Sequence, residues 1–138
     1  MIVAKYSKTN IVGAGIAGMT AAINLSRFGK SVIIYEKNKS IGSSRDGDYE
    51  GIENWIFSEN LTNSKTLCGI EFNGIPKYPI FEFFVHLNGV KPLKIKSLEP
   101  FFYLVKRGDD SDSFDNYLAE VCDSLNVKFL FNKTYDIN

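Results

Sequence analysis

The stretch NIVGAGIAGMTAAINLSRFGKSVIIYE, residues 10–36, decides the fold of this chain. A short apolar entry leads directly into three glycines with the spacing Gly-x-Gly-x-x-Gly. A run of helical periodicity follows and ends at Gly29, and a second apolar run then closes on the acid Glu36. This pattern predicts a right-handed β-α-β unit, with a strand over 9–12, a helix over 16–28 and a second strand over 31–36.

The three glycines have the spacing of a turn that holds a pyrophosphate. Gly13 permits the tight turn from strand to helix, Gly15 lets a phosphate approach the backbone, and Gly18 lets the helix pack closely against the strand. The N–H groups and positive dipole end of the helix attract the phosphates. Glu36 follows Gly18 by 18 residues, where a carboxylate can accept hydrogen bonds from ribose hydroxyls. We therefore predict an adenine-dinucleotide site.

A bare Gly-x-Gly-x-x-Gly also arises in structural turns and in protein kinases. The alternative is a purely structural role, in which the motif is a glycine-rich turn in an α/β core and Glu36 is a solvated acid at a strand end. The strand before the motif, the helix after it and the second strand ending in an acid favour the dinucleotide site. Glu36 also disfavours a ligand with a 2′-phosphate, because two negative charges would meet there.

Composition excludes several classes of function. The chain has 138 residues with 16 basic and 16 acidic side chains, so no overall field indicates a nucleic-acid partner. The sequence contains no run of 18 apolar residues, the length that a membrane-spanning helix needs. An acidic stretch within 109–123, which includes Asp115, and a basic stretch within 91–107, which includes Arg107, are predicted to be solvated faces. The two cysteines and the single histidine, His86, lack metal or catalytic spacing, and a reducing cytoplasm fits them.

The remainder of the chain divides into an irregular part, a β-rich part and a final helix and strand. Turn residues dominate 37–80, where residues near Trp55 could form a short buried helix or turn. Strands are predicted within 81–106, with Asn88-Gly89 as a hairpin signal. Ser113 is the expected N-cap of an amphipathic helix that ends near Asn126, and 127–131 is the expected third parallel strand, beside the second.

These features together resemble the N-terminal part of an FAD-dependent oxidoreductase. The similarity is to flavoproteins of the glutathione-reductase and p-hydroxybenzoate-hydroxylase type, nearest to the geranylgeranyl-reductase-like branch. It is carried by residues 11–18, by Gly29 and Val32, by Tyr35-Glu36-Lys37, and by the later order of strand, Arg107-Gly108, helix and strand. The resemblance implies an α/β fold: a partial Rossmann-like FAD-binding domain with a three-stranded parallel half-sheet and an irregular, antiparallel-β insertion.

The resemblance also implies which residues hold the cofactor, FAD. The turn residues would face the pyrophosphate, Glu36 would hold the adenosine ribose with Lys37 beside the adenine, and Ser44 and Arg45 would lie in a cofactor-contacting loop. Trp55 would pack either near the flavin or in the core. The family often has paired glycines in this loop, whereas Gly42 is followed here by Ser43. The full set of expected cofactor-binding residues is Gly13, Gly15, Ile16, Ala17, Gly18, Glu36, Lys37, Ser44 and Arg45.

The late motifs of such flavoproteins, on which the flavin half of the site depends, have no counterpart in this sequence. We therefore interpret the chain as a truncated product or fragment that binds FAD and is not competent for turnover alone. The expected division is 1–40 for the first β-α-β unit, 41–106 for the insertion and 107–138 for the returning helix and strand. The alternatives are an NAD-binding Rossmann module and a non-enzymatic dinucleotide-binding or partner-binding subunit completed by a second chain.

Overall fold

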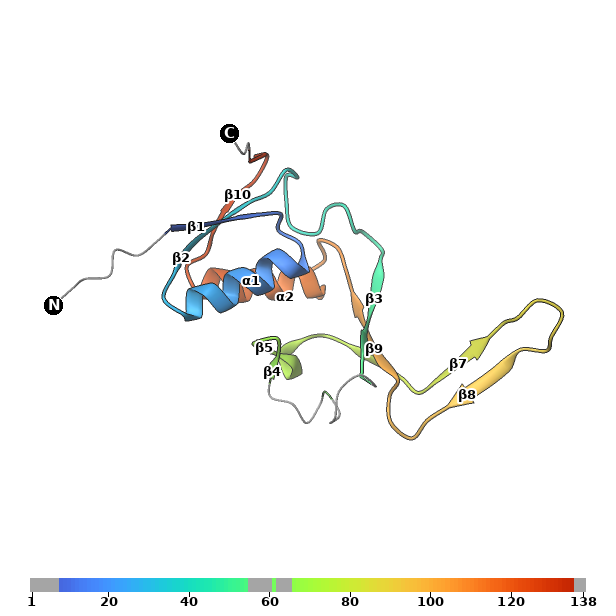
Figure 1. Cartoon of the computed structure of the whole chain (residues 1–138). Helices are drawn as coiled ribbons and strands as arrows, with labels where there is room; N and C mark the ends of the chain where they lie inside the picture. The colour runs from blue at the N-terminus through green and yellow to red at the C-terminus, as the bar shows by residue number, and fades with distance from the viewer. Residues whose placement is uncertain (1–7, 55–60, 62–65, 136–138) are drawn as a thin grey trace.

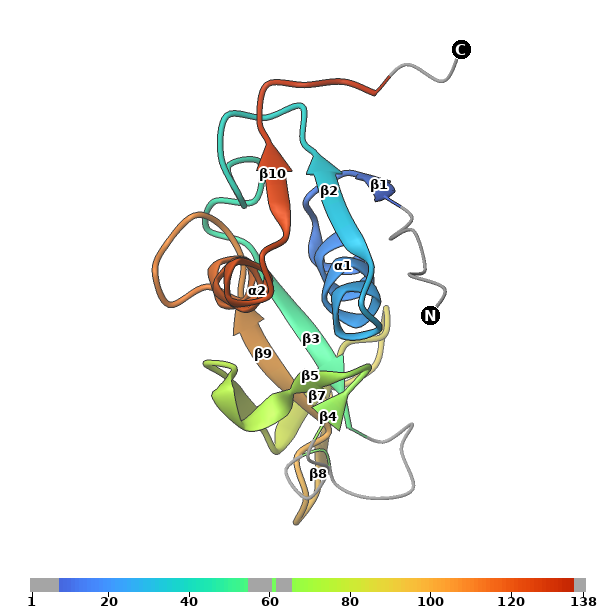
Figure 2. The ribbon, with the colours of Figure 1, turned by 90° about the vertical axis from the view of Figure 1, so that its left-hand side faces the viewer.

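A three-stranded parallel sheet organises the N- and C-terminal parts of the chain. The computed structural model describes residues 8–54, 61 and 66–135. Strands β1 (Lys8–Val12) and β10 (Lys128–Leu130) pair in parallel with opposite edges of β2 (Ser31–Tyr35), so the order is β1-β2-β10. The half-sheet predicted from the sequence is thus confirmed, and Figure 2 shows β10 returning beside β2.

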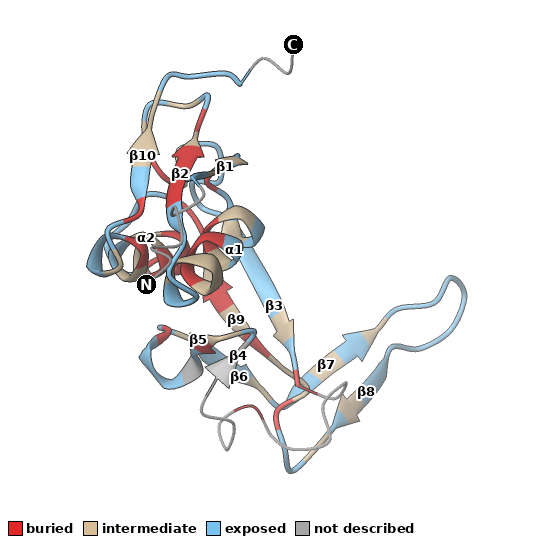
Figure 3. Cartoon of the chain, turned by 60° about the vertical axis from the view of Figure 1, so that its left-hand side comes forward, coloured by how far each residue is buried: buried red, intermediate tan, exposed pale blue. Residues whose placement is uncertain are grey.

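Two helices lie side by side beneath this sheet and supply much of the core (Figure 2). They are α1 (Ile16–Arg27) and α2 (Phe114–Ser124). Met19, Ile23 and Leu118 are fully buried between the helices and the sheet, and the thiol of Cys122 on α2 lies 3.7 Å from the Met19 carbonyl oxygen on α1. Figure 3 shows that the buried residues concentrate on β2, on the facing sides of α1 and α2, and on β9 (Phe102–Lys106).

The predicted ends of both helices are confirmed. Gly29 adopts a φ of 77° just after α1, in the left-handed region that glycine tolerates best. The Ser113 hydroxyl accepts a hydrogen bond from the Asn116 N–H at 3.1 Å and so caps α2. Asn126, with a φ of 58°, follows the end of α2 and turns the chain toward β10.

A second, antiparallel sheet corrects the prediction that residues 37–80 are irregular. Its order is β3-β9-β6, and the strands are β3 (Tyr49–Glu53), β9 and β6 (Tyr78–Ile80). Short elements between them are β4 (Thr66–Leu67), β5 (Ile70–Glu71) and a 3-10 turn, η1 (Phe72–Gly74). The local sequence pattern did not predict β3 and β6 because these strands are stabilised by pairing with β9, a strand far along the chain. Pro79 is compatible with β6 because that strand is at the sheet edge.

The predicted hairpin exists and projects away from the two sheets (Figure 1). It consists of β7 (Glu82–Val85) and β8 (Leu93–Lys96). Asn88 and Gly89 form its turn, with the Val90 N–H donating to the Leu87 carbonyl at 3.2 Å, but the connection spans 86–92 and is longer than a two-residue loop. His86 lies exposed in this connection.

Trp55 lies outside the described residues. Leu61, from the same predicted segment, is buried with 2% of its surface exposed. Within 8–54, 61 and 66–135, no helix is long and apolar enough to cross a membrane.

Candidate functional site

The glycine turn between β1 and α1 has the geometry that its spacing predicts. Gly13 has a φ of 94°, and its N–H donates to the Tyr35 carbonyl oxygen at 2.8 Å, which ties the turn to the end of β2. A Cβ atom at Gly18 would lie 2.1 Å from the Gly13 carbonyl oxygen. Only glycine therefore allows α1 to pack this closely on the turn that precedes it.

The N-terminus of α1 is open to a ligand. Gly15 is its N-cap residue and offers no side-chain cap, so the N–H groups of the first turn have no partner within the helix. A Cβ atom at Gly15 would meet no atom within 4 Å. This combination of free N–H donors, a positive dipole end and open space suits a phosphate group.

Glu36 is held beside this helix end by two backbone N–H groups. Its Oε2 accepts from the Ala14 N–H at 2.7 Å, and its Oε1 accepts from the Asn38 N–H at 2.8 Å. The residue is buried, with 8% of its surface exposed, so the two bonds fix its orientation. Each carboxylate oxygen can accept a further bond, and Glu36 can therefore still bind a hydroxyl group.

A cavity of about 560 Å³ brings the helix end, Glu36 and the following loop together. All the predicted cofactor-binding residues line it except Gly13 and Gly18, which instead shape the turn behind it. Sequence reasoning did not assign the other lining residues to the site: Ala14, Asn38, Ser40, Gly42, Glu50, Arg107 and Asp115.

The loop after β2, which carries Ser44 and Arg45, packs against the chain just after β9. Gly42 has a φ of 69°, and a Cβ atom there would lie 2.1 Å from the Gly108 carbonyl oxygen, so this loop depends on a backbone-to-backbone approach. The Arg45 guanidinium is 3.4 Å from the Asp48 carboxylate, and both side chains are exposed. Arg45 is thus placed at the cavity with its charge accessible to a ligand.

Arg107 is the main residue that sequence reasoning missed. Its Nε and Nη2 donate to the two carboxylate oxygens of Asp115 at 2.7 and 3.0 Å, and its Nη1 donates to Glu50. The Asp115 side chain is 2% exposed and that of Arg107 is 9% exposed. The prediction that both residues lie on solvated faces is therefore wrong. The pKa of Arg107 is raised, mainly by the hydrogen bond to Asp115, so the guanidinium stays charged.

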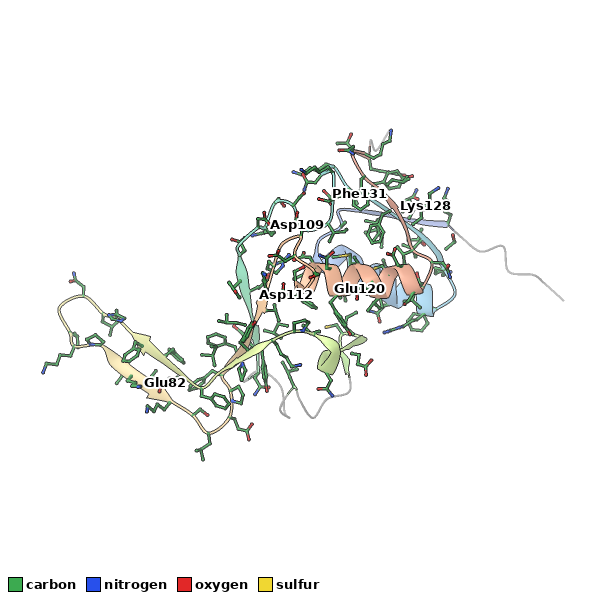
Figure 4. The ribbon with its side chains drawn as sticks, turned by 180° about the vertical axis from the view of Figure 1, so that it is seen from behind. Glu82, Asp109, Asp112, Glu120, Lys128 and Phe131 are labelled. Carbon is green, nitrogen blue, oxygen red and sulfur yellow. The ribbon has the colours of Figure 1, made fainter. Side chains whose placement is uncertain are left out.

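The other charges near this end of the molecule are at the surface, as predicted. The Lys106 ammonium contacts Asp110 at 2.7 Å and Asp112 at 2.9 Å, and these carboxylates raise the pKa of Lys106. Asp46 raises the pKa of Asp109 through a shared hydrogen bond between the two carboxyl groups. Figure 4 shows Asp109 and Asp112 in the connection that leads into α2. None of these five residues lines the cavity.

The cavity is suited to binding. It offers N–H donors for an anion, two exposed cationic side chains, Lys37 and Arg45, and the hydroxyl-accepting carboxylate of Glu36. Among the residues that the structure describes, no group of three or more His, Cys, Asp or Glu could hold a metal ion.

Comparison with known proteins agrees with this geometry. Residues 11–57 match the family model of the NAD(P)-binding Rossmann-like domain. The fold is similar to that of a variant of 2-methyl-3-hydroxypyridine-5-carboxylic acid oxygenase, with a TM-score of 0.64 and 19% identity over 93% of this chain and 32% of that chain. It is also similar to CtdE in complex with FAD and a substrate, with a TM-score of 0.63 and 25% identity over 91% of this chain and 30% of that chain.

A third similar structure is pqsL, a probable FAD-dependent monooxygenase from Pseudomonas aeruginosa, with a TM-score of 0.56 and 18% identity over 90% of this chain and 33% of that chain. The chain thus has the Rossmann-like fold of these flavoproteins and spans about a third of their length. The predicted resemblance to an FAD-dependent oxidoreductase is confirmed at the level of the fold. The geranylgeranyl-reductase-like branch stays a prediction.

Proposed function

We propose that this chain is the FAD-binding segment of a flavin-dependent oxidoreductase, and that it binds the cofactor without being competent for turnover on its own. The observation that carries the proposal is the hydrogen bond from the Ala14 N–H to Glu36, which fixes an acceptor for ribose hydroxyls beside an uncapped helix N-terminus. The adenosine and pyrophosphate of a dinucleotide need these two features next to each other.

Residues of this chain can be assigned to the adenine, the ribose and the pyrophosphate of the cofactor. Glu36 would accept from the adenosine ribose, Lys37 would lie beside the adenine, and the backbone at Gly15, Ile16 and Ala17 would hold the pyrophosphate. Ser44 and Arg45 would contact the cofactor from the loop after β2. FAD, once bound, supplies hydride or electron transfer, while the protein supplies binding, orientation and electrostatics.

The proposal includes a division of the chain into a first β-α-β unit (1–40), an insertion (41–106) and a returning helix and strand (107–138). It also includes a location in the cytoplasm and a lipid-like substrate of the geranylgeranyl-reductase type. The rest of the flavin site would come from a C-terminal half or a second chain. The structures to which this chain is similar are about three times as long, which supports that expectation. An NAD-binding module is the second candidate, because the same turn and acid serve NAD and the matching family model describes NAD(P) binding.

The test is a calorimetric titration of the purified chain with FAD, NAD and ADP, repeated with Glu36→Gln. We expect saturable FAD binding that is weakened about tenfold in Glu36→Gln, because one charge-assisted acceptor for the ribose is lost. Glu53→Gln, an exposed carboxylate on β3 outside the cavity, is the matched control. Tighter binding of NAD than of FAD would contradict the flavoprotein assignment, and equal affinities for the parent and Glu36→Gln would remove Glu36 from the site.

A further inference from the structure

The sequence contains two Asn-Gly pairs, Asn73-Gly74 and Asn88-Gly89. An asparagine before glycine is the one whose side chain most readily reacts with the backbone, because glycine has no side chain to hinder the approach of its nitrogen and rotates freely. Both asparagines are exposed, so neither access to solvent nor the residue that follows distinguishes them. The difference between the two pairs lies in how the fold holds each glycine.

Asn88 and Gly89 form the turn of the hairpin β7–β8, which projects away from the two sheets (Figure 1). The turn is closed by the Val90 N–H, which donates to the Leu87 carbonyl oxygen, and this closing bond does not use the Gly89 N–H. A Cβ atom at Gly89 would meet no atom within 4 Å, and Leu87 and Val90 are each 63% exposed. The backbone at Gly89 can therefore rotate without displacing a packed side chain.

Asn73 and Gly74 lie in η1, where the backbone is held from two sides. In a 3-10 turn each N–H is directed at the carbonyl three residues earlier, so the Gly74 N–H points to Glu71. The Tyr117 hydroxyl donates to the same Glu71 carbonyl oxygen at 2.8 Å, and a Cβ atom at Gly74 would lie 2.8 Å from that hydroxyl oxygen. The next residue, Ile75, is 2% exposed and fixes the chain in the core. A reaction at Asn73 therefore requires this segment to open first.

We propose that Asn88 is a site of spontaneous deamidation in the folded chain, and that the fold protects Asn73 from the same reaction. The Gly89 nitrogen gives up its proton to a base in the solvent and forms a bond to Cγ of Asn88. The Cγ–Nδ2 bond breaks, and the side-chain nitrogen takes a proton from water and leaves as ammonia. Water then opens the resulting cyclic imide to aspartate or isoaspartate, so the overall change consumes water and releases ammonia.

The modification would alter the hairpin and leave the dinucleotide cavity unchanged, so this inference is independent of the proposed function. Isoaspartate carries the main chain through the side chain of residue 88 and lengthens the turn by one methylene group. The hydrogen bond from Val90 to Leu87 spans that position and would lose its geometry. A two-stranded hairpin is only marginally stable, so the pairing of β7 with β8 should loosen. None of residues 82–96 lines the dinucleotide cavity.

The test incubates the purified chain at mildly alkaline pH and follows both asparagines by peptide mapping with mass spectrometry and by enzymatic methylation of isoaspartate. The same incubation in urea is the control, because both asparagines precede glycine and should react at similar rates once the fold is lost. In the folded chain we expect Asn88 to react at least about tenfold faster than Asn73, since only the fraction of molecules with an open η1 segment can react at Asn73. The rate at Asn88 should stay within about threefold of its rate in urea.

Two variants complete the experiment. Tyr117→Ala removes the ring that packs on Gly74, so it should raise the rate at Asn73 about threefold or more and leave the rate at Asn88 unchanged. Asn88→Gln, whose longer side chain does not close the same ring, should abolish the reaction at residue 88. Equal rates at the two asparagines of the folded parent, or a rate at Asn88 far below its rate in urea, would overturn the inference. A folded Tyr117→Ala variant with an unchanged rate at Asn73 would overturn the explanation of its protection.

Discussion

Alanine substitutions at two glycines of the same turn should affect stability and cofactor binding separately. Gly15 and Gly18 lie three residues apart, but a Cβ atom at Gly15 would enter open space, while one at Gly18 would lie 2.1 Å from the Gly13 carbonyl oxygen. Substituting alanine at each position adds the same methyl group to two different environments. We expect Gly15→Ala to lose cofactor binding with little loss of stability, and Gly18→Ala to lose stability.

The magnitudes follow from these contacts. At Gly18, alanine gains about 1 kcal/mol in helix propensity. Against this, the Gly13 carbonyl must move by more than an ångström, and overpacking of this kind costs about 3 kcal/mol at the upper end of its usual range. The net loss of about 2 kcal/mol should lower the melting temperature by about 8 °C for a chain of this size.

At Gly15 the structural cost is small, because exchanging glycine for alanine at an N-cap costs about 1 kcal/mol or less. The methyl group would occupy the space through which a pyrophosphate approaches the helix N-terminus, so FAD affinity should fall at least about tenfold, or 1.4 kcal/mol. Circular dichroism melts and calorimetric titration of both variants measure the two effects. A Gly18→Ala variant as stable as the parent, or a Gly15→Ala variant that binds FAD normally, would refute this reading of the turn.

Two further predictions concern buried groups. Asp115→Asn should lower the free energy of unfolding by about 3 kcal/mol in urea denaturation, because it removes the buried carboxylate partner of the buried Arg107 and leaves only the exposed Glu50. Asp112→Asn, which removes an exposed ion pair, should cost about 1 kcal/mol or less, and equal losses for the two variants would contradict the difference in burial. Burial raises the pKa of the Cys122 thiol to about 12, so at pH 8 a thiol reagent should label only Cys68 in the folded chain and both cysteines in denaturant. Rapid labelling of Cys122 without unfolding would contradict its burial.

The first β-α-β unit and the last helix and strand were predictable because their signals are local. The glycine spacing, the acid at the end of β2 and the serine cap of α2 all act within a few residues of where they occur. The position of β10 beside β2 followed from the parallel connection through a helix. Most of the predicted cofactor-binding residues consequently line one cavity.

The second sheet was not predictable in the same way. The sequence Tyr49–Glu53 contains a glycine and two acids, and Tyr78–Ile80 contains a proline, so neither has the alternation of an independent strand. Both pair with β9, which lies up to 57 residues away between Tyr49 and Lys106. Pairing over that distance leaves no trace in the local pattern.

By itself, the sequence determined the glycine turn between β1 and α1, the acid that faces it and the fold class, since each depends on residues close together in the chain. Only the tertiary structure decided that Glu50, Arg107 and Asp115 meet beside that turn. The sequence alone predicts that Arg107 and Asp115 belong to two solvated charge runs, because charge does not reveal burial. The physical reason is that the Arg107–Asp115 ion pair is buried by the packing of α2 against the chain just after β9, with Glu50 of β3 beside it, and that packing is a property of the whole fold.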